Sequence, residues 1–133
     1  MTILAIDPGN IESAYCVINT ETYKPKFFAK VDNEYLKSWI RTHDTMFDKV
    51  IIEMVASYGM PVGESVFQTC VWIGRYVQLA DELGKDFKFI YRKDEKMNIC
   101  HSMKAKDSNI RQALIDRFGP VGTKNNPRLV LWI

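Results

Sequence analysis

Two short apolar segments, each ending in a carboxylate, constrain the fold of this chain most strongly. Residues 3–7 are Ile-Leu-Ala-Ile-Asp, and residues 50–53 are Val-Ile-Ile-Glu. Continuous apolar segments of this length predict buried strands. The sequence between them is long enough for a crossover connection, so the two strands can be parallel neighbours. In that arrangement Asp7 and Glu53 lie at the same edge of one sheet.

The rest of the pattern predicts a single α/β domain. The predicted strands span residues 2–7, 13–19, 26–31, 49–54 and 87–92, and the predicted helices span residues 34–43, 64–83 and 106 or 107 to 118. The basic residues 93–106 are expected to be irregular. Asp32 or Asn33 is expected to cap the first helix, and Gly84 and Gly119 to end the other two.

Composition fits an ordinary domain of modest size. The chain has 133 residues, 47% of them apolar, which suffices for a sizeable core. No segment approaches the roughly 18 uninterrupted apolar residues of a membrane span, and the first residues do not resemble a signal peptide, so we expect a cytoplasmic protein without membrane contact. The three cysteines are widely spaced, which indicates reduced thiols rather than a disulfide framework or a zinc site.

Charge is distributed unevenly along the chain. Residues 1–84 hold 7 Lys and Arg against 11 Asp and Glu, a net charge of −4, whereas residues 85–133 hold 11 against 5, a net charge of +6. A basic half of this kind fits a polyanion partner such as nucleic acid, although charge runs are also common on solvated faces.

Asp7 and Glu53 are candidate metal ligands on physical grounds. Carboxylates crowded at the end of buried strands repel each other and lose hydration, so the arrangement is costly unless a cation neutralises it. Magnesium prefers oxygen ligands, and a pair of such ions about 4 Å apart can activate water and stabilise the leaving oxygen of a phosphodiester. A different reading stays open, because Asp before Pro-Gly commonly starts a turn and a strand-terminal Glu commonly forms a surface ion pair.

Three segments taken together resemble the RuvC-type Holliday-junction resolvases of the RNase H-like superfamily. Residues 5–9, Ala-Ile-Asp-Pro-Gly, followed by Ser-Ala-Tyr at residues 13–15, are similar to the opening of these proteins. Residues 50–53 resemble their second acidic strand, and residues 105–118 resemble the helix that follows their basic loop. The order and spacing agree over about residues 2–119, and the shorter form found in phages and prophages is the most similar.

The resemblance implies an RNase H-like fold and a nuclease activity. The expected fold is a mixed five-stranded sheet, a three-strand antiparallel meander plus two parallel strands, flanked by helices. The expected activity is the resolution of Holliday junctions or other branched DNA by a homodimer, through hydrolysis that depends on magnesium or manganese, in a bacterial or phage-infected cell.

The resemblance also implies roles for individual residues. Asp7 and Glu53 would be metal ligands, and both would be catalytic together with Lys106. The DNA-binding residues would be Lys104, Lys106, Arg111 and Tyr58. Lysine near the scissile phosphate can offset transition-state charge, and an aromatic ring can stack on an unpaired base. The long helix that follows Glu64 is the candidate dimer contact, with Phe67 expected to pack in the core.

The end of the chain departs from the family pattern. Members carry a last helix with one or two acidic residues that completes the metal cage, whereas no acidic residue follows Asp116 here. We therefore expect a single nuclease domain over residues 1–133 that is truncated at its C-terminus by a frameshift or a premature stop. Asp107 could substitute as a ligand, but its position favours a helix N-cap.

Two rival functions stay open at this stage. An actin-like or sugar-kinase domain also opens with a strand, Asp-x-Gly and a phosphate-holding hairpin, but it needs a second such domain and a further glycine-rich loop, which we do not find. A catalytically impaired junction-binding protein would keep the basic surface and the dimer but lack the acidic helix, and the sequence does not exclude it.

Overall fold

A five-stranded sheet with helices on both sides forms the protein, as the computed structural model shows over the described residues, 1–56 and 59–123. The elements, in chain order, are β1 (Thr2–Asp7), β2 (Glu12–Asn19), β3 (Pro25–Asp32), α1 (Asn33–Thr42), a short 3₁₀ helix η1 (Asp44–Met46), β4 (Lys49–Glu53), α2 (Glu64–Glu82), β5 (Asp86–Ile90), α3 (Arg92–Cys100) and α4 (Asp107–Phe118).

The sheet is mixed, with the strand order β3-β2-β1-β4-β5. The pairs β1–β2 and β2–β3 are antiparallel, whereas β1–β4 and β4–β5 are parallel. The predicted meander followed by two parallel strands is confirmed. The predicted strand limits differ from the observed ones by at most two residues at either end.

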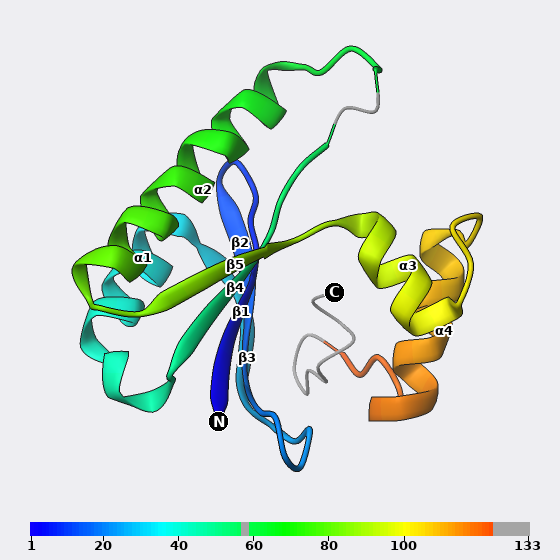
Figure 1. Ribbon diagram of the computed structural model, residues 1–133, viewed down its shortest axis with the longest axis horizontal. Coiled ribbons are helices and arrows are strands. Elements are labelled where there is room, and N and C mark those ends of the chain that lie inside the picture. The colour runs from blue at the N-terminus through cyan, green and yellow to red at the C-terminus, as the bar shows by residue number, and fades with distance from the viewer. Residues whose placement is uncertain (57–58, 124–133) are drawn as a thin grey trace.

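The main core lies on one face of the sheet. Leu4 and Ile6 of β1 and Val50 and Ile52 of β4 are buried there, because alternate residues of a strand point to the same face. Figure 1 shows α1 and α2 covering this face, and α3 and α4 lying on the opposite side of the sheet. β4 lies between β1 and β5, as a buried strand would, but Ile51, on its second face, is only half-buried.

Local signals in the sequence explain where the helices begin and end. The Asp32 side chain accepts hydrogen bonds from the backbone N–H groups of Glu34 and Tyr35, at 2.9 and 3.4 Å, and so caps α1. Gly84 follows α2 with φ of 67°, and Gly119 follows α4 with φ of 91°, conformations that glycine adopts at low cost. Over the described residues, no helix combines the length and apolar character needed to cross a bilayer.

The prediction of irregular structure over residues 93–106 is wrong for its first part, which forms α3. This helix has no apolar periodicity to predict it, and none of its residues is fully buried. Its start is fixed instead by hydrogen bonds, because the Tyr91 N–H donates to Asp94 Oδ2 at 3.0 Å and the Asp94 N–H donates to the Tyr91 carbonyl at 2.9 Å. All three cysteines are half-buried free thiols, as expected.

The two faces of β4 should differ in their contribution to stability. Ile52 is 0% exposed inside the main core, so Ile52→Ala should lower the free energy of unfolding by about 2–5 kcal/mol. Ile51→Ala, on the neighbouring residue, should cost roughly 1 kcal/mol, because its side chain is only half-buried. Urea denaturation of the two variants measures both values, and equal losses would contradict the assignment of the core to one face.

Candidate metal and nucleic-acid site

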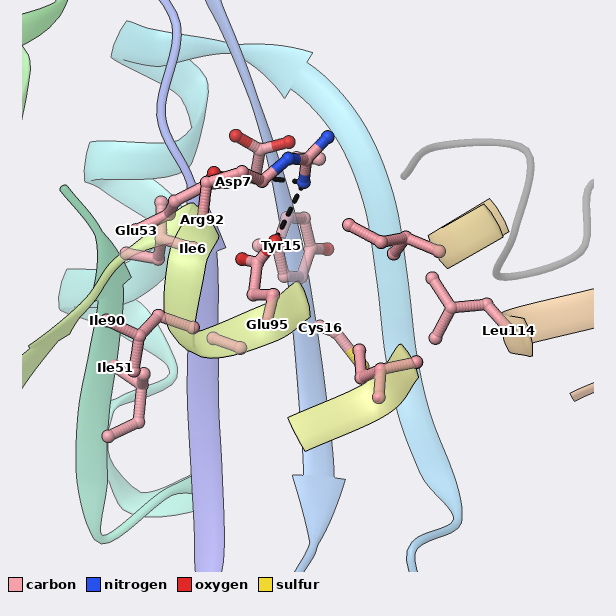
Figure 2. A pocket seen from close by; sticks show the side chains of 14 residues that line it. Ile6, Asp7, Tyr15, Cys16, Ile51, Glu53, Ile90, Arg92, Glu95 and Leu114 are labelled. Carbon is pink, nitrogen blue, oxygen red and sulfur yellow. Dashed lines mark hydrogen bonds and ion pairs between the residues drawn. The ribbon is translucent and has the colours of Figure 1, made fainter. Parts of the chain in front are cut away.

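The parallel pairing of β1 with β4 brings Asp7 and Glu53 together. Ile6 lies opposite Ile52 in the register, so the carboxylates that follow leave the sheet side by side on the face turned toward α3. Figure 2 shows both side chains at the same end of a cavity. The juxtaposition expected from the sequence is therefore present, although the roles of the two residues in catalysis or metal binding remain candidate roles.

The Glu53 carboxyl is electrostatically disfavoured as an anion. Burial, followed by the charges of Asp7 and Glu95, raises the pKa of Glu53 to about 8. The protonated carboxyl also donates a hydrogen bond to Asp7, which raises the pKa further, whereas the nearby Arg92 guanidinium lowers it. The carboxylates of the site therefore carry more negative charge than the Arg92 guanidinium compensates.

Two carboxylates in this arrangement fit one divalent cation. Magnesium is commonly held by one or two carboxylates together with waters and substrate phosphates, and the raised pKa of Glu53 is the effect expected where a cation is needed. Within residues 1–56 and 59–123, no group of three or more His, Cys, Asp or Glu side chains is close enough together to hold a metal. The described residues therefore suit a single ion with two protein ligands, not an enclosed cage.

A buried polar network fixes the loop that follows Asp7. Asn33 Nδ2 donates to the Gly9 carbonyl at 2.9 Å, and the Gly9 N–H donates to Ser13 Oγ at 3.2 Å. Ser13 Oγ donates to Asn33 Oδ1 at 2.6 Å, and the Tyr76 hydroxyl of α2 lies 3.0 Å from both of these oxygens. A Cβ atom at Gly9 would lie 2.2 Å from the Glu12 carbonyl oxygen, so only glycine fits there.

Sequence reasoning did not find this network. Asn33 was considered only as an alternative cap for α1, but its side chain instead reaches back to Gly9. Tyr76 falls within the predicted helix over residues 64–83 without any signal of this role, yet it is 1% exposed and its hydroxyl hydrogen bonds to two polar side chains. The network is a second reason why Asp7 has a defined position, since it holds the turn two residues further along the chain.

A largely apolar cavity of about 260 Å³ separates the sheet from α3 and α4. Asp7, Glu53, Arg92 and Glu95 form its charged part. The apolar part of the lining is formed by Ala5, Ile6, Ala14, Ile51, Ile90, Ile99, Ile110 and Leu114, together with Tyr15 and Cys16. Burial raises the pKa of the Cys16 thiol to about 11, so it is protonated near neutral pH.

Arg92 and Glu95 are charged residues of the site that the sequence does not indicate, whereas the sequence offers Asp107 as a substitute ligand but favours it as a helix cap. Arg92 contacts three carboxylates, those of Glu53, Glu95 and Asp107. The expectation that Asp107 caps α4 is wrong, because Lys106 is the N-cap and Asp107 is the first helical residue. A signal existed for one of these contacts, since Arg92 and Glu95 have the i,i+3 spacing of a helical ion pair, but the helix was not predicted.

The predicted basic residues lie beside the acidic site rather than inside it. Lys104, Lys106 and Arg111 are exposed around the start of α4. Arg111 lines a small groove with Arg92 and Asp107. Neither lysine lines the two cavities that contain Asp7 and Glu53, in which Arg92 is the basic residue among those described. Tyr58 lies outside the described residues, so its predicted DNA contact has no structural counterpart here.

Phe67 is not a core residue, contrary to expectation. Its side chain is 60% exposed on α2, and Val71, one turn further along, is 54% exposed. The two side chains lie on the same face of the helix because residues four apart are neighbours on its surface.

Comparison with solved structures supports the fold that these observations suggest. The structure of Thermus thermophilus RuvC matches with a TM-score of 0.73 and 16% identity, over 99% of this chain and 89% of that one. The chain has the RuvC fold. The structure of T. thermophilus RuvC in complex with a Holliday junction substrate matches this chain equally well, with a TM-score of 0.73 and 15% identity over 99% of this chain and 88% of that one. The sequence itself matches no protein-family model and no curated protein.

The mixed sheet of the RNase H-like fold, flanked by helices, is thus confirmed. The similarity to the phage form stays a prediction. So does the truncation, which concerns the end of the chain, where residues 124–133 lie outside the described residues.

The crowding of Asp7 and Glu53 should be visible in the pH dependence of stability. The folded-state pKa of Glu53 lies above the ordinary value of 4.5. The stabilisation linked to protonation of Glu53 is therefore fully present below pH 4.5 and is lost as the pH rises through about 8. In EDTA, Asp7→Asn should therefore melt at a higher temperature than the wild type at pH 9, by roughly 4 °C for each kcal/mol of repulsion removed, and show little gain at pH 5.

Differential scanning fluorimetry measures this difference. Asp116→Asn is the matched control, since Asp116 is exposed on α4 and hydrogen bonds Gln112. Manganese should raise the melting temperature of the wild type and of Asp116→Asn, but not that of Asp7→Asn. A melting-temperature gain for Asp7→Asn that is the same at both pH values would contradict the coupling of the two carboxylates.

Proposed function

We propose that this chain is a structure-selective endodeoxyribonuclease that resolves Holliday junctions or other branched DNA by magnesium-dependent hydrolysis. The observation that carries the proposal is the convergence of Asp7 and Glu53 at the end of two parallel strands. The RuvC fold adds support, because a protein with this fold has been solved in complex with a Holliday junction substrate. Manganese is expected to replace magnesium.

In this proposal Asp7 and Glu53 are the metal ligands and the catalytic carboxylates. A divalent ion bound to them would activate the attacking water and stabilise the leaving oxygen of the phosphodiester. The buried hydrogen bonds of Gly9, Ser13 and Asn33 hold the loop beside Asp7 in place, so that its carboxylate needs little reorganisation when the ion binds.

The exposed basic residues around the start of α4 supply the DNA contacts. Lys104, Lys106 and Arg111 would bind backbone phosphates, which gives affinity without sequence selectivity and makes binding fall as salt rises. Lys106 is proposed as the catalytic lysine, since its flexible side chain stands at the N-cap of α4, next to Asp107. Tyr58 is retained as a proposed stacking residue.

A second candidate function is a catalytically impaired junction-binding protein. It is favoured by one observation, that the described residues contain no group of three metal-binding side chains. Such a protein would keep the fold and the basic surface, but it would hold a divalent ion too weakly for turnover.

Incubation of the full chain with an end-labelled four-way junction and magnesium or manganese separates the two candidates. Paired nicks that are lost in Asp7→Asn, with junction affinity in a gel-shift assay unchanged within about twofold, are the expected result. Binding without nicking by the wild type would support the impaired protein instead. Asp116→Asn, which changes an exposed carboxylate of α4, is the matched control and should cut normally.

The proposal includes a homodimer that joins through α2. The exposed Phe67 and Val71 form an apolar stripe in the first half of this helix, and Figure 1 shows that half extending beyond the ends of the strands. A twofold dimer would present two equivalent sites to the two equivalent strands of a four-way junction.

Substitution of the stripe tests the dimer. Phe67→Glu should shift the chain from dimer to monomer in size-exclusion chromatography with light scattering, because it buries a charge at the contact. Ser65→Glu adds the same charge to an exposed position in the same part of α2 and should leave the dimer intact. A wild-type chain that is already monomeric at about 100 µM would argue against the proposed contact.

A further inference from the structure

Arg92 occupies an unusual place, because it brings a permanent positive charge to the carboxylates of the candidate metal site. Ile90 at the end of β5 lies opposite Glu53 of β4 in the parallel register. Tyr91 follows, and Arg92 is the first residue of α3. Its side chain therefore lies over the end of β4, and Figure 2 shows the guanidinium beside Asp7, Glu53 and Glu95.

The guanidinium is held firmly by the helices and only loosely by the sheet. Arg92 Nη1 lies 2.8 Å from Glu95 Oε2. Arg92 Nε and Nη2 lie 3.2 and 3.1 Å from Asp107 Oδ1. The distance from Nη1 to Glu53 Oε1 is longer, at 3.8 Å, beyond hydrogen-bonding range. Loss of the contact with Glu53 would therefore leave the anchoring contacts with Glu95 and Asp107 in place.

The charges around Arg92 place it in competition with a metal ion. Three carboxylates, those of Glu53, Glu95 and Asp107, lie within ion-pair distance of a single guanidinium that stays charged at any ordinary pH, and Asp7 interacts with Glu53. A divalent ion bound to Glu53 would stand within a few ångströms of that guanidinium, and like charges at such distances repel strongly in a partly buried site. The ion and the guanidinium therefore cannot both interact strongly with Glu53.

We propose that Arg92 competes with the divalent cation for Glu53, while Glu95 and Asp107 keep the displaced guanidinium at the site. This inference rests on the proposed function, because it takes Asp7 and Glu53 as the cation ligands. It concerns regulation of that site: the protein binds the cation weakly by itself. A DNA phosphate strengthens cation binding, because it contributes an oxygen ligand to the ion and a new partner to the guanidinium.

Manganese binding to the full chain without DNA tests the competition. Free Mn²⁺ is counted by electron paramagnetic resonance for the wild type, Arg92→Gln and Lys93→Gln. Arg92→Gln should bind Mn²⁺ at least about tenfold more tightly than the wild type, because one positive charge next to the ion is gone. Lys93→Gln removes the same charge one residue away, where the side chain is exposed and lies over the Tyr91 ring, and should change the affinity less than about twofold.

The other outcomes are distinguishable. If the wild type binds Mn²⁺ in a manner that Asp7→Asn abolishes, but Arg92→Gln binds no more tightly, the competition is refuted and the nuclease proposal stands. If Arg92→Gln binds no Mn²⁺ without DNA, the competition is refuted, and if neither protein binds Mn²⁺ even with a four-way junction present, the nuclease proposal fails as well. An equal gain in affinity for Arg92→Gln and Lys93→Gln would reveal a general charge effect and would also refute the role of Arg92.

A measurement on the wild type covers the case in which Arg92→Gln does not fold. In a titration with diamagnetic Mg²⁺, the Nε–H resonance of Arg92 should shift with the same midpoint as the resonances of the Asp7 and Glu53 backbone amides, because the guanidinium leaves Glu53 as the ion binds. A stationary Arg92 resonance alongside shifting amides of Asp7 and Glu53 would overturn the inference. Addition of a four-way junction should make Mn²⁺ bind more tightly than it does without DNA, both to the wild type and to the Asp116→Asn control.

Discussion

The parallel pairing of β1 with β4 determines most of what this protein can do. Residues 3–6 of β1 and 50–52 of β4 are all apolar, and the parallel register places the C-terminal ends of the two strands side by side. The adjacent carboxylates repel each other as a result, and the unfavourable electrostatics must be offset by the burial of Leu4, Ile6, Val50 and Ile52 on the other face. Stability of the core and strain at the site therefore share one structural origin.

The polar network around Asn33 connects that site to the second layer of the fold. Tyr76 lies on α2 and reaches residues of the β1–β2 hairpin and of α1, so three elements meet at a few fully buried oxygens. In the described residues, no buried side-chain nitrogen or oxygen lacks a hydrogen-bond partner, which makes the network satisfied and therefore rigid. Asp7 is thus held by a strand on one side and by a fixed loop on the other.

The sequence predicted the sheet and the acidic pair because both have strong local signals. Uninterrupted apolar residues define β1 and β4, and the position of Asp7 and Glu53 at their ends follows from strand geometry. The polar network could not be predicted, since Tyr76 lies 63 and 43 positions from its partners Ser13 and Asn33 and no local pattern links them. Helix α3 was missed because mixed charges conceal its period, and with it the position of Arg92.

The strand order has a consequence for how copies of this protein can associate. The two outer strands, β3 and β5, have backbone groups that could pair with another strand. Both carry charges, at Lys26 and Lys30 in β3 and at Asp86 and Lys88 in β5, and β3 also begins with Pro25, which has no N–H to donate. These residues disfavour the pairing of β3 or β5 with a strand of another copy, and so they disfavour edge-to-edge aggregation at high protein concentration.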